Sequence, residues 1–239
     1  MSAKKLFVIV PHPDDESFVP GGTIAKYGHT ESCEVFLYTL TKGEASRNAK
    51  LLSITNEEMG NRREQEVRDA ARILGVKGHY QSAYPDAGLR DLDPRILERE
   101  ISEKILLIEP HVLLTYDVQG TSAHPDHIVV HHVVKRCFLS LREQVPSLRR
   151  LAFFNVTDKT VQHFPRKLFG FPPERIHAII DVAIWLALKK QAIDVQVSVR
   201  RDVEEQNFEN WLFAPFEYFS FFRESYSPPV HDLFTGIES

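Results

Sequence analysis

Short runs of apolar residues recur along the chain and alternate with segments of helical periodicity. The runs predict buried strands over residues 6–10, 33–40, 78–82, 112–116, 151–156 and 176–182. Helices are predicted over residues 61–74, 94–108 and 128–141 and within 181–193, with a shorter one around 23–27. This alternation of strands and helices favours an α/β fold with a mainly parallel sheet.

The same pattern gives one domain over residues 1–239. Neither a low-complexity linker nor a repeat with a period of tens of residues interrupts it. The polar stretch 45–60 is predicted to be a flexible loop with one or two helical turns. The aromatic-rich segment 208–222 is predicted to pack against the rest of the domain.

Composition narrows the class of protein. A formal net charge of −4 gives no basic face for nucleic acid. No apolar run reaches the roughly 18 to 20 residues of a membrane span, and no signal-peptide cleavage site follows the first strand. Cys33 and Cys137 are expected to be buried, reduced thiols. We expect a cytoplasmic protein without an integral membrane segment, and the sequence leaves open whether it forms a homo-oligomer.

Two polar clusters follow predicted strands: one comes after the strand at residues 6–10, the other after the strand at residues 112–116. They read His12-Pro13-Asp14-Asp15-Glu16 and His124-Pro125-Asp126-His127. In a parallel sheet both would lie at the carboxyl ends of the strands, where ligands bind. His12 and Asp15 are spaced to share one side of a helical turn, and His127 would complete a site of two imidazoles and one carboxylate. Such a site suits Zn²⁺, with Fe²⁺ as the alternative.

The remaining polar residues of the two clusters suit acid–base chemistry. Asp14 is a candidate general base. His124 would stabilise an oxyanion or protonate a leaving amine, and Asp126 would orient it or keep it charged. The alternative is that the acidic residues cap the following helix and that the histidines lie on the surface.

The ordered motifs resemble the LmbE/PIG-L-like metal-dependent de-N-acetylases over about residues 6–135. The segments that carry the resemblance are Pro11-His12-Pro13-Asp14-Asp15-Glu16, Gly21-Gly22-Thr23, Thr41-Lys42-Gly43-Glu44, Arg63-Glu64-Gln65-Glu66, Asp86-Ala87-Gly88-Leu89 and His124-Pro125-Asp126-His127. The resemblance implies a Rossmann-like three-layer α/β fold and a zinc-dependent hydrolase that removes an N-acetyl group from small molecules or glycoconjugates containing N-acetylglucosamine.

By position, the resemblance implies a role for each site residue. The metal ligands are His12, Asp15 and His127, and the catalytic groups are Asp14 and His124. Arg63 and Asp86 fall where that family places groups that contact the sugar or organise a loop. One departure concerns the stretch Gln196-Val197-Ser198-Val199, where family members often carry a His-x-Ser-Gln-like segment.

Other functions remain open at this point. One is a different metal-dependent amidase, esterase or phosphoesterase. A phosphoesterase would usually need a second metal about 3.5–4 Å from the first. The other is a non-catalytic sugar-binding module of the same fold.

Overall fold

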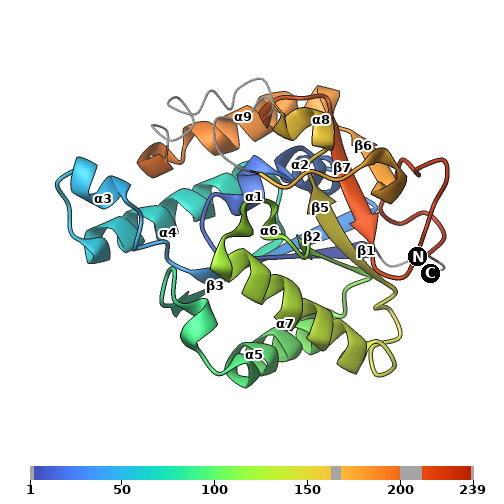
Figure 1. Cartoon of the computed structure of the whole chain (residues 1–239), viewed down its shortest axis with the longest axis horizontal. Helices are drawn as coiled ribbons and strands as arrows, with labels where there is room; N and C mark the ends of the chain where they lie inside the picture. The colour runs from blue at the N-terminus through green and yellow to red at the C-terminus, as the bar shows by residue number, and fades with distance from the viewer. Residues whose placement is uncertain (1–2, 163–167, 200–211, 238–239) are drawn as a thin grey trace.

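The apolar strand β1 (Lys4–Val10) lies inside the sheet, with a parallel strand hydrogen-bonded on each side. The computed structural model describes residues 3–162, 168–199 and 212–237. Its sheet has seven strands in the order β3-β2-β1-β4-β5-β7-β6 (Figure 1). All neighbouring strands are parallel except β7, which is antiparallel to both β5 and β6. The other strands are β2 (Cys33–Thr41), β3 (Gly78–Tyr84), β4 (Val112–Tyr116), β5 (Arg150–Asn155), β6 (Ala178–Asp181) and β7 (Phe216–Phe221).

Helices connect the strands and cover both faces of the sheet. The α-helices are α1 (Asp15–Phe18), α2 (Gly21–Gly28), α3 (Asn48–Leu51), α4 (Asn56–Ile73), α5 (Pro94–Ile108), α6 (Gly120–Ala123), α7 (Pro125–Leu141), α8 (Asp158–Val161) and α9 (Leu186–Asp194). Short 3₁₀ helices are η1 (Leu89–Asp91), η2 (Pro173–Arg175), η3 (Ala183–Trp185) and η4 (Val197–Val199).

The core has two halves, one on each face of the sheet. Because side chains alternate along a strand, Leu6, Val8 and Val10 pack against α2, α4 and α9 on one face. Phe7 and Ile9 pack against α5 and α7 on the other. The two groups of helices lie above and below the sheet in Figure 1. The predicted three-layer α/β fold with a mainly parallel sheet is therefore confirmed.

The predicted loop 45–60 is largely helical. It contains α3 and the first turn of α4, which begins at Asn56 and not at Asn61. Thr55 closes a capping box with Glu58: each side chain binds the backbone N–H of the other residue. This Thr-x-x-Glu signal precedes the apolar periodicity by a full turn, so the periodicity alone placed the helix start too late.

The aromatic C-terminal segment does more than pack on the body. Residues 208–211 lie outside the described residues, but Phe216–Phe221 forms β7 in the interior of the sheet, with Phe219 and Phe221 buried. Irregular spacing of polar and aromatic residues hides this strand, because an interior strand is recognised by uniform apolarity.

The two glycines at the start of α2 serve close packing. A Cβ on Gly22 would lie 2.7 Å from Cβ of Val182. The backbone N–H groups of Gly22 and Thr23 donate to the carboxylate of Glu217 on β7, at 2.9 and 2.8 Å. A carboxylate of the protein itself therefore occupies this helix N-terminus, where its charge is favourable.

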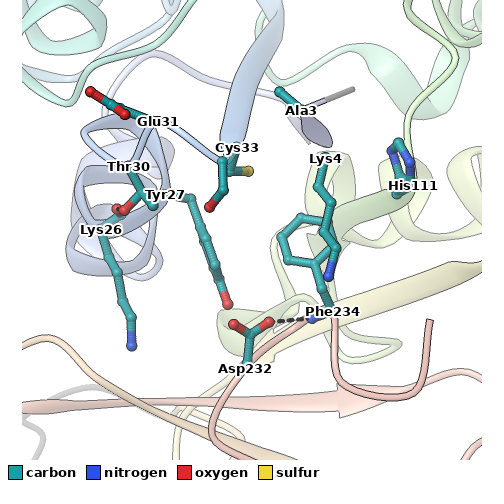
Figure 2. A pocket seen from close by; sticks show the side chains of 11 residues that line it. Ala3, Lys4, Lys26, Tyr27, Thr30, Glu31, Cys33, His111, Asp232 and Phe234 are labelled. Atoms are coloured by element: carbon teal, nitrogen blue, oxygen red, sulfur yellow. Dashed lines mark hydrogen bonds between the residues drawn. The ribbon is translucent and has the colours of Figure 1, made fainter. Parts of the chain in front are cut away.

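A cavity of about 480 Å³ lies at the amino ends of the strands (Figure 2). Lys4, Cys33 and His111, which line it, stand at or just before the starts of β1, β2 and β4. The polar clusters His12–Glu16 and His124–His127 follow the opposite, carboxyl ends. Among the described residues, no helix combines the length and apolarity needed to cross a membrane.

Candidate active site

The loops after β1 and β4 bring the two polar clusters together, as the sheet topology predicts. The ring centroids of His12 and His127 lie 5.3 Å apart, and those of His12 and His124 lie 4.8 Å apart. The helix α7 begins at Pro125 and not near Ile128, so His127 lies in its first turn and His124 is its N-cap residue. Pro125 suits this position because the missing N–H is not needed in the first helical turn.

The three predicted metal ligands form a contiguous group. A carboxylate oxygen of Asp15 lies 3.4 Å from Nδ1 of His12, and the other lies 3.6 Å from Nε2 of His127. Nδ1 of His127 donates to the carbonyl of Gly120 at 3.0 Å, which turns Nε2 toward the cluster. Burial opposes ionisation of Asp15, but the surrounding imidazoles and the Tyr116 hydroxyl outweigh it and lower the pKa of this carboxyl.

The opposite nitrogen of His12 faces two further carboxylates. Nε2 of His12 lies 3.1 Å from Asp126 and 3.2 Å from Asp86. Asp126 also accepts from the backbone N–H of Leu89 at 3.1 Å. Burial alone would lower the pKa of His12, but its carboxylate partners outweigh burial, and the pKa is raised well above the ordinary value.

The expected partnership of Asp126 with His124 is corrected by these contacts. Within the described part of the chain, the Asp126 carboxylate lies against His12, and it is the Asp126 backbone N–H that donates to Nδ1 of His124, at 3.3 Å. Burial is the largest influence on His124, and its pKa is lowered, not raised as a carboxylate partner would require. The cause is the start of α7: His124 is the N-cap residue, and its ring accepts from the backbone of Asp126 two positions later.

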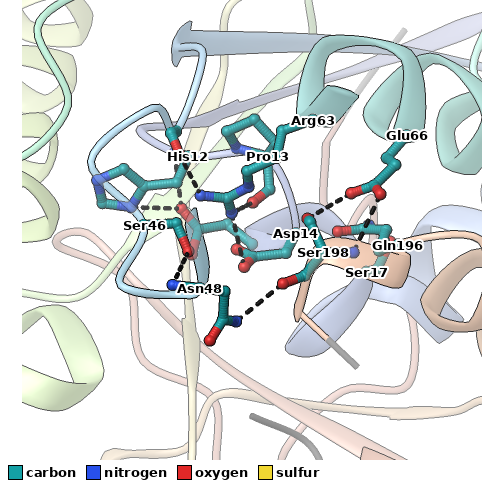
Figure 3. A network of polar contacts seen from close by, with 12 residues as sticks. His12, Pro13, Asp14, Ser17, Ser46, Asn48, Arg63, Glu66, Gln196 and Ser198 are labelled. Carbon is teal, nitrogen blue, oxygen red and sulfur yellow. Dashed lines mark hydrogen bonds and ion pairs between the residues drawn. The ribbon is translucent and has the colours of Figure 1, made fainter. Parts of the chain in front are cut away.

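Asp14 lies beside the ligand group with a strained backbone. Its φ of 101° is in the region that residues with a Cβ rarely adopt. Arg63, a predicted substrate contact, is buried and donates to the Asp14 carboxylate at 2.9 Å and to the carbonyls of Pro13 and Gly43 (Figure 3). Burial raises the pKa of Asp14 well above its usual range, although Arg63 opposes the shift.

Asp86, the other predicted substrate contact, links the site to the segment after β2. Its carboxylate accepts from the N–H of Ala45 at 2.9 Å, and its own N–H donates to Glu44 at 2.9 Å. Arg63 and Asp86 thus organise loops around the site in this structure, one of the two roles that the resemblance implies.

Two residues that touch the site were given no role from the sequence, although one of them, Glu16, lies in the first polar cluster. The hydroxyl of Tyr116, the last residue of β4, donates to Asp15, and its ring stacks on His127 with a centroid separation of 3.8 Å. Glu16 is fully buried and accepts from the Asp14 N–H at 3.0 Å. A tyrosine at the carboxyl end of a predicted strand is the one signal that was available for Tyr116.

The donors present fit a divalent metal ion. Two sets of three residues place their nitrogen or oxygen atoms within 4.8 Å of one another: His12, His124 and His127, and His12, Asp86 and Asp126. Imidazole and carboxylate are the ligands of catalytic zinc sites, and a ligand histidine usually donates its other N–H to a carboxylate. Nδ1 and Nε2 of His12, which face different carboxylates, match that arrangement.

An α/β sheet with grouped histidines and aspartates at its carboxyl edge defines an α/β enzyme with a candidate metal centre. The family model described as GlcNAc-PI de-N-acetylase (PIG-L) matches residues 7–138. The chain is also 31% identical, over the full length of both proteins, to 1D-myo-inositol 2-acetamido-2-deoxy-α-D-glucopyranoside deacetylase of Mycobacteroides abscessus. The chain belongs to the PIG-L family of de-N-acetylases.

Solved structures share the fold at low sequence identity. N,N'-diacetylchitobiose deacetylase from Pyrococcus horikoshii matches 92% of this chain and 84% of its own, with a TM-score of 0.70 and 22% identity. The 4-carboxy-2-hydroxymuconate hydratase GalB from Pseudomonas putida matches 93% of this chain and 98% of its own, with a TM-score of 0.68 and 18% identity. The same fold therefore carries more than one reaction, so function has to be argued from the site and from the sequence relatives.

Proposed function

We propose that this protein is a metal-dependent hydrolase that removes the N-acetyl group from a small molecule containing N-acetylglucosamine. The observation that carries the proposal is the match over the full length of both chains to a deacetylase whose name specifies a 2-acetamido sugar linked to inositol. The grouping of His12, Asp15 and His127 beside Asp14 supports hydrolysis as the chemistry. We further propose that residues 1–239 act as one deacetylase domain, because β7 joins the C-terminal segment to the interior of the sheet.

The metal would be held by His12, Asp15 and His127. Two imidazoles and one carboxylate suit Zn²⁺, with Fe²⁺ as the alternative. When bound, such an ion supplies Lewis acidity toward the acetyl carbonyl and activates the attacking water. Asp126 and Asp86, on the opposite side of the His12 ring, would fix the orientation and tautomer of that ligand.

Asp14 takes a proton from the attacking water as general base. A carboxylate acts best in this role when its pKa approaches neutral pH, and burial raises the pKa of Asp14 in that direction. Arg63 holds the carboxylate in place through its hydrogen bond of 2.9 Å. The proton then passes from Asp14 to the leaving amine, because a neutral His124 ring has no acidic proton to give.

His124 stabilises the oxyanion as a neutral donor. Because Nδ1 accepts from the backbone N–H of Asp126, the ring proton resides on Nε2. The lowered pKa of His124 keeps the ring uncharged at neutral pH. An N–H donor aimed at the developing oxyanion contributes roughly 10²–10³ to kcat.

The test is amine release by the purified protein, with its metal content measured in parallel. The substrates are the inositol-linked 2-acetamido sugar, N,N'-diacetylchitobiose and free N-acetylglucosamine. We expect acetate and amine in equal amounts, and loss of turnover by about 10²–10⁴-fold in Asp14→Asn with the metal retained. Asp69→Asn, at a partly exposed carboxylate on α4, is the matched control.

Two outcomes would overturn the proposal. Binding of the sugars without amine release by the metal-loaded protein would indicate a sugar-binding module. Hydrolysis of phosphate or carboxylic esters with no activity on the N-acetyl compounds would indicate a different metal hydrolase. Loss of the metal in Asp14→Asn would instead make Asp14 a ligand and reverse the roles of the two aspartates.

A further inference from the structure

The segment that departs from the family pattern, Gln196 to Val199, is anchored in the site. Gln196 is 1% exposed, and its side-chain Nε2 donates to Glu16 at 2.6 Å and to Oγ of Ser17 at 2.8 Å. Figure 3 shows Gln196 reaching the first polar cluster from the C-terminal part of the chain. The contact joins residues 180 positions apart.

Glu16 links Gln196 to Asp14, because its carboxylate accepts hydrogen bonds from both residues. One carboxylate oxygen of Glu16 accepts from Gln196 and from Oγ of Ser17, and the other accepts from the backbone N–H of Asp14 at 3.0 Å. Glu16 and Ser17 are both fully buried, so no exposed water competes for these bonds. Among the described residues, three donors therefore set the orientation of the Glu16 carboxylate. Asp14 and Ser17 are its neighbours in sequence, and Gln196 is the distant one.

The Asp14 backbone needs such support. A residue with a Cβ at φ 101° costs about 1–3 kcal/mol and persists only where surrounding contacts enforce it. Arg63 holds the side chain of Asp14, and Glu16 holds its N–H. Without the donor from Gln196, the neighbouring Ser17 hydroxyl is left as the side-chain donor to Glu16, and the hold on that carboxylate is weakened.

The segment itself is held independently of this contact. Ser198 donates through its N–H and hydroxyl to Glu66 on α4, and its carbonyl accepts from the Asn48 side chain at 2.8 Å. Glu66 lies one turn after Arg63 on the same helix. Thus α4 carries both the anchor of the Gln196 segment and the arginine that binds Asp14.

We propose that Gln196 is a positioning residue: through Glu16 it fixes the strained backbone of Asp14, and so the direction of the Asp14 carboxylate in the reaction. This inference rests on the proposed function, in which Asp14 is the general base. Gln196 acts on turnover and not on substrate affinity, because its described side-chain hydrogen bonds go to Glu16 and Ser17 and to none of the proposed metal ligands.

The kinetic test replaces Gln196 with methionine, which keeps the length of the side chain and removes the amide donor. For Gln196→Met we expect kcat to fall about 10- to 100-fold, with KM within about twofold of wild type and the metal content unchanged. Gln196→Asn retains an amide but is one methylene shorter, so it should also lower kcat and leave KM nearly unchanged. This second variant keeps the test valid if Gln196→Met does not fold. Gln191→Met, an exposed glutamine on α9, is the matched control and should behave as wild type.

A double-mutant cycle tests the route through Glu16. If Gln196 acts through Glu16, Gln196→Met should cost little further kcat in a Glu16→Gln background. If Gln196→Met lowered kcat by the same factor in wild type and in Glu16→Gln, the route through Glu16 would be overturned. Loss of folded protein lowers the apparent kcat and leaves KM unchanged, so kcat is expressed per folded, metal-loaded molecule. A Gln196→Met enzyme with normal kcat on that basis would overturn the positioning role.

A crystal structure of Gln196→Met gives a readout that does not depend on activity. We expect Asp14 to leave the positive-φ region, whereas an unchanged Asp14 backbone would refute the inference. If wild type releases no amine from any N-acetyl substrate, the proposed function fails, and this structural measurement still decides the role of Gln196.

Discussion

The buried imidazole of His131 makes stability sensitive to acid. Nδ1 of His131 donates to the carbonyl of Tyr116 at 3.0 Å, and Nε2 is one of the buried atoms without a partner in the described chain. Protonation would place an unpaired N–H and a positive charge in the core, and burial accordingly lowers the pKa of His131 to about 4.

The unfolded chain binds this proton near its ordinary pKa of about 6.5, so the free energy of unfolding is lost as pH falls below that value. We expect His131 to account for about 2 kcal/mol of the stability lost between pH 7.5 and pH 5. Urea unfolding at both pH values should therefore show a smaller loss in His131→Leu than in wild type. His132→Leu, an exposed neighbour, should lose as much as wild type, and an equal loss in all three proteins would contradict the prediction.

Single residues differ in how far the sequence predicts their surroundings. The grouping of His12, Asp15 and His127 was predictable, because each follows or lies close to the carboxyl end of a parallel strand. The partner of Asp126 was not, because the short helix α6, directly before α7, contains Thr121 and Ala123 at positive φ. Such backbone conformations have no signature in residue spacing.

The capping box at the start of α4 gives a prediction at the scale of an element. Oγ1 of Thr55 accepts from the N–H of Glu58 at 3.1 Å, and removing that acceptor leaves a helix N–H without a protein partner. We expect Thr55→Ala to lower the free energy of unfolding by about 1 kcal/mol. Amide exchange should become faster in the first turn of α4, ahead of Arg63.

Asn56→Ala, at the next exposed position, is the control for Thr55→Ala. It should change stability by no more than about 0.5 kcal/mol. If both variants lose the same stability, helix propensity and not the cap is responsible.

Elements built on one strong periodicity were predictable nearly to their ends. The helix α5 and the strand β4 match their predicted bounds, since Asp93 and Pro94 mark one and uniform apolarity marks the other. The strand β7 was not predicted, and α3 was predicted only as a helical turn within a loop; both depend on tertiary partners. Asn48 in α3 contacts Ser198, and β7 pairs with strands that precede it in the chain. Those partners cannot be read from a local window.

At the scale of the whole molecule, one buried ion pair joins the first and last parts of the fold. Lys189 on α9 lies 2.7 Å from Glu217 on β7, and that carboxylate also receives the two N–H groups at the start of α2. We expect Glu217→Gln to lower the free energy of unfolding by roughly 3–5 kcal/mol, because it leaves a buried ammonium without its counter-charge.

The double variant Glu217→Gln/Lys189→Met should be more stable than Glu217→Gln alone, since it removes the unpaired charge. Lys190→Met, which breaks an exposed pair with Asp194 on the same helix, should cost less than about 1 kcal/mol. Thermal melts of the four proteins test both statements. A double variant that is less stable than Glu217→Gln would mean that the Lys189 side chain matters for packing and not for charge.

The place of β7 between β5 and β6 has a consequence for synthesis. Both β5 and β6 are synthesised before β7, the strand that separates them in the finished sheet. In the finished sheet β5 and β6 run in the same direction, so a direct pairing between them would be well aligned and would exclude the last strand. The edges of β5 and β6 must therefore stay unpaired until β7 has been synthesised. If synthesis stops before β7, these unpaired edges would promote aggregation.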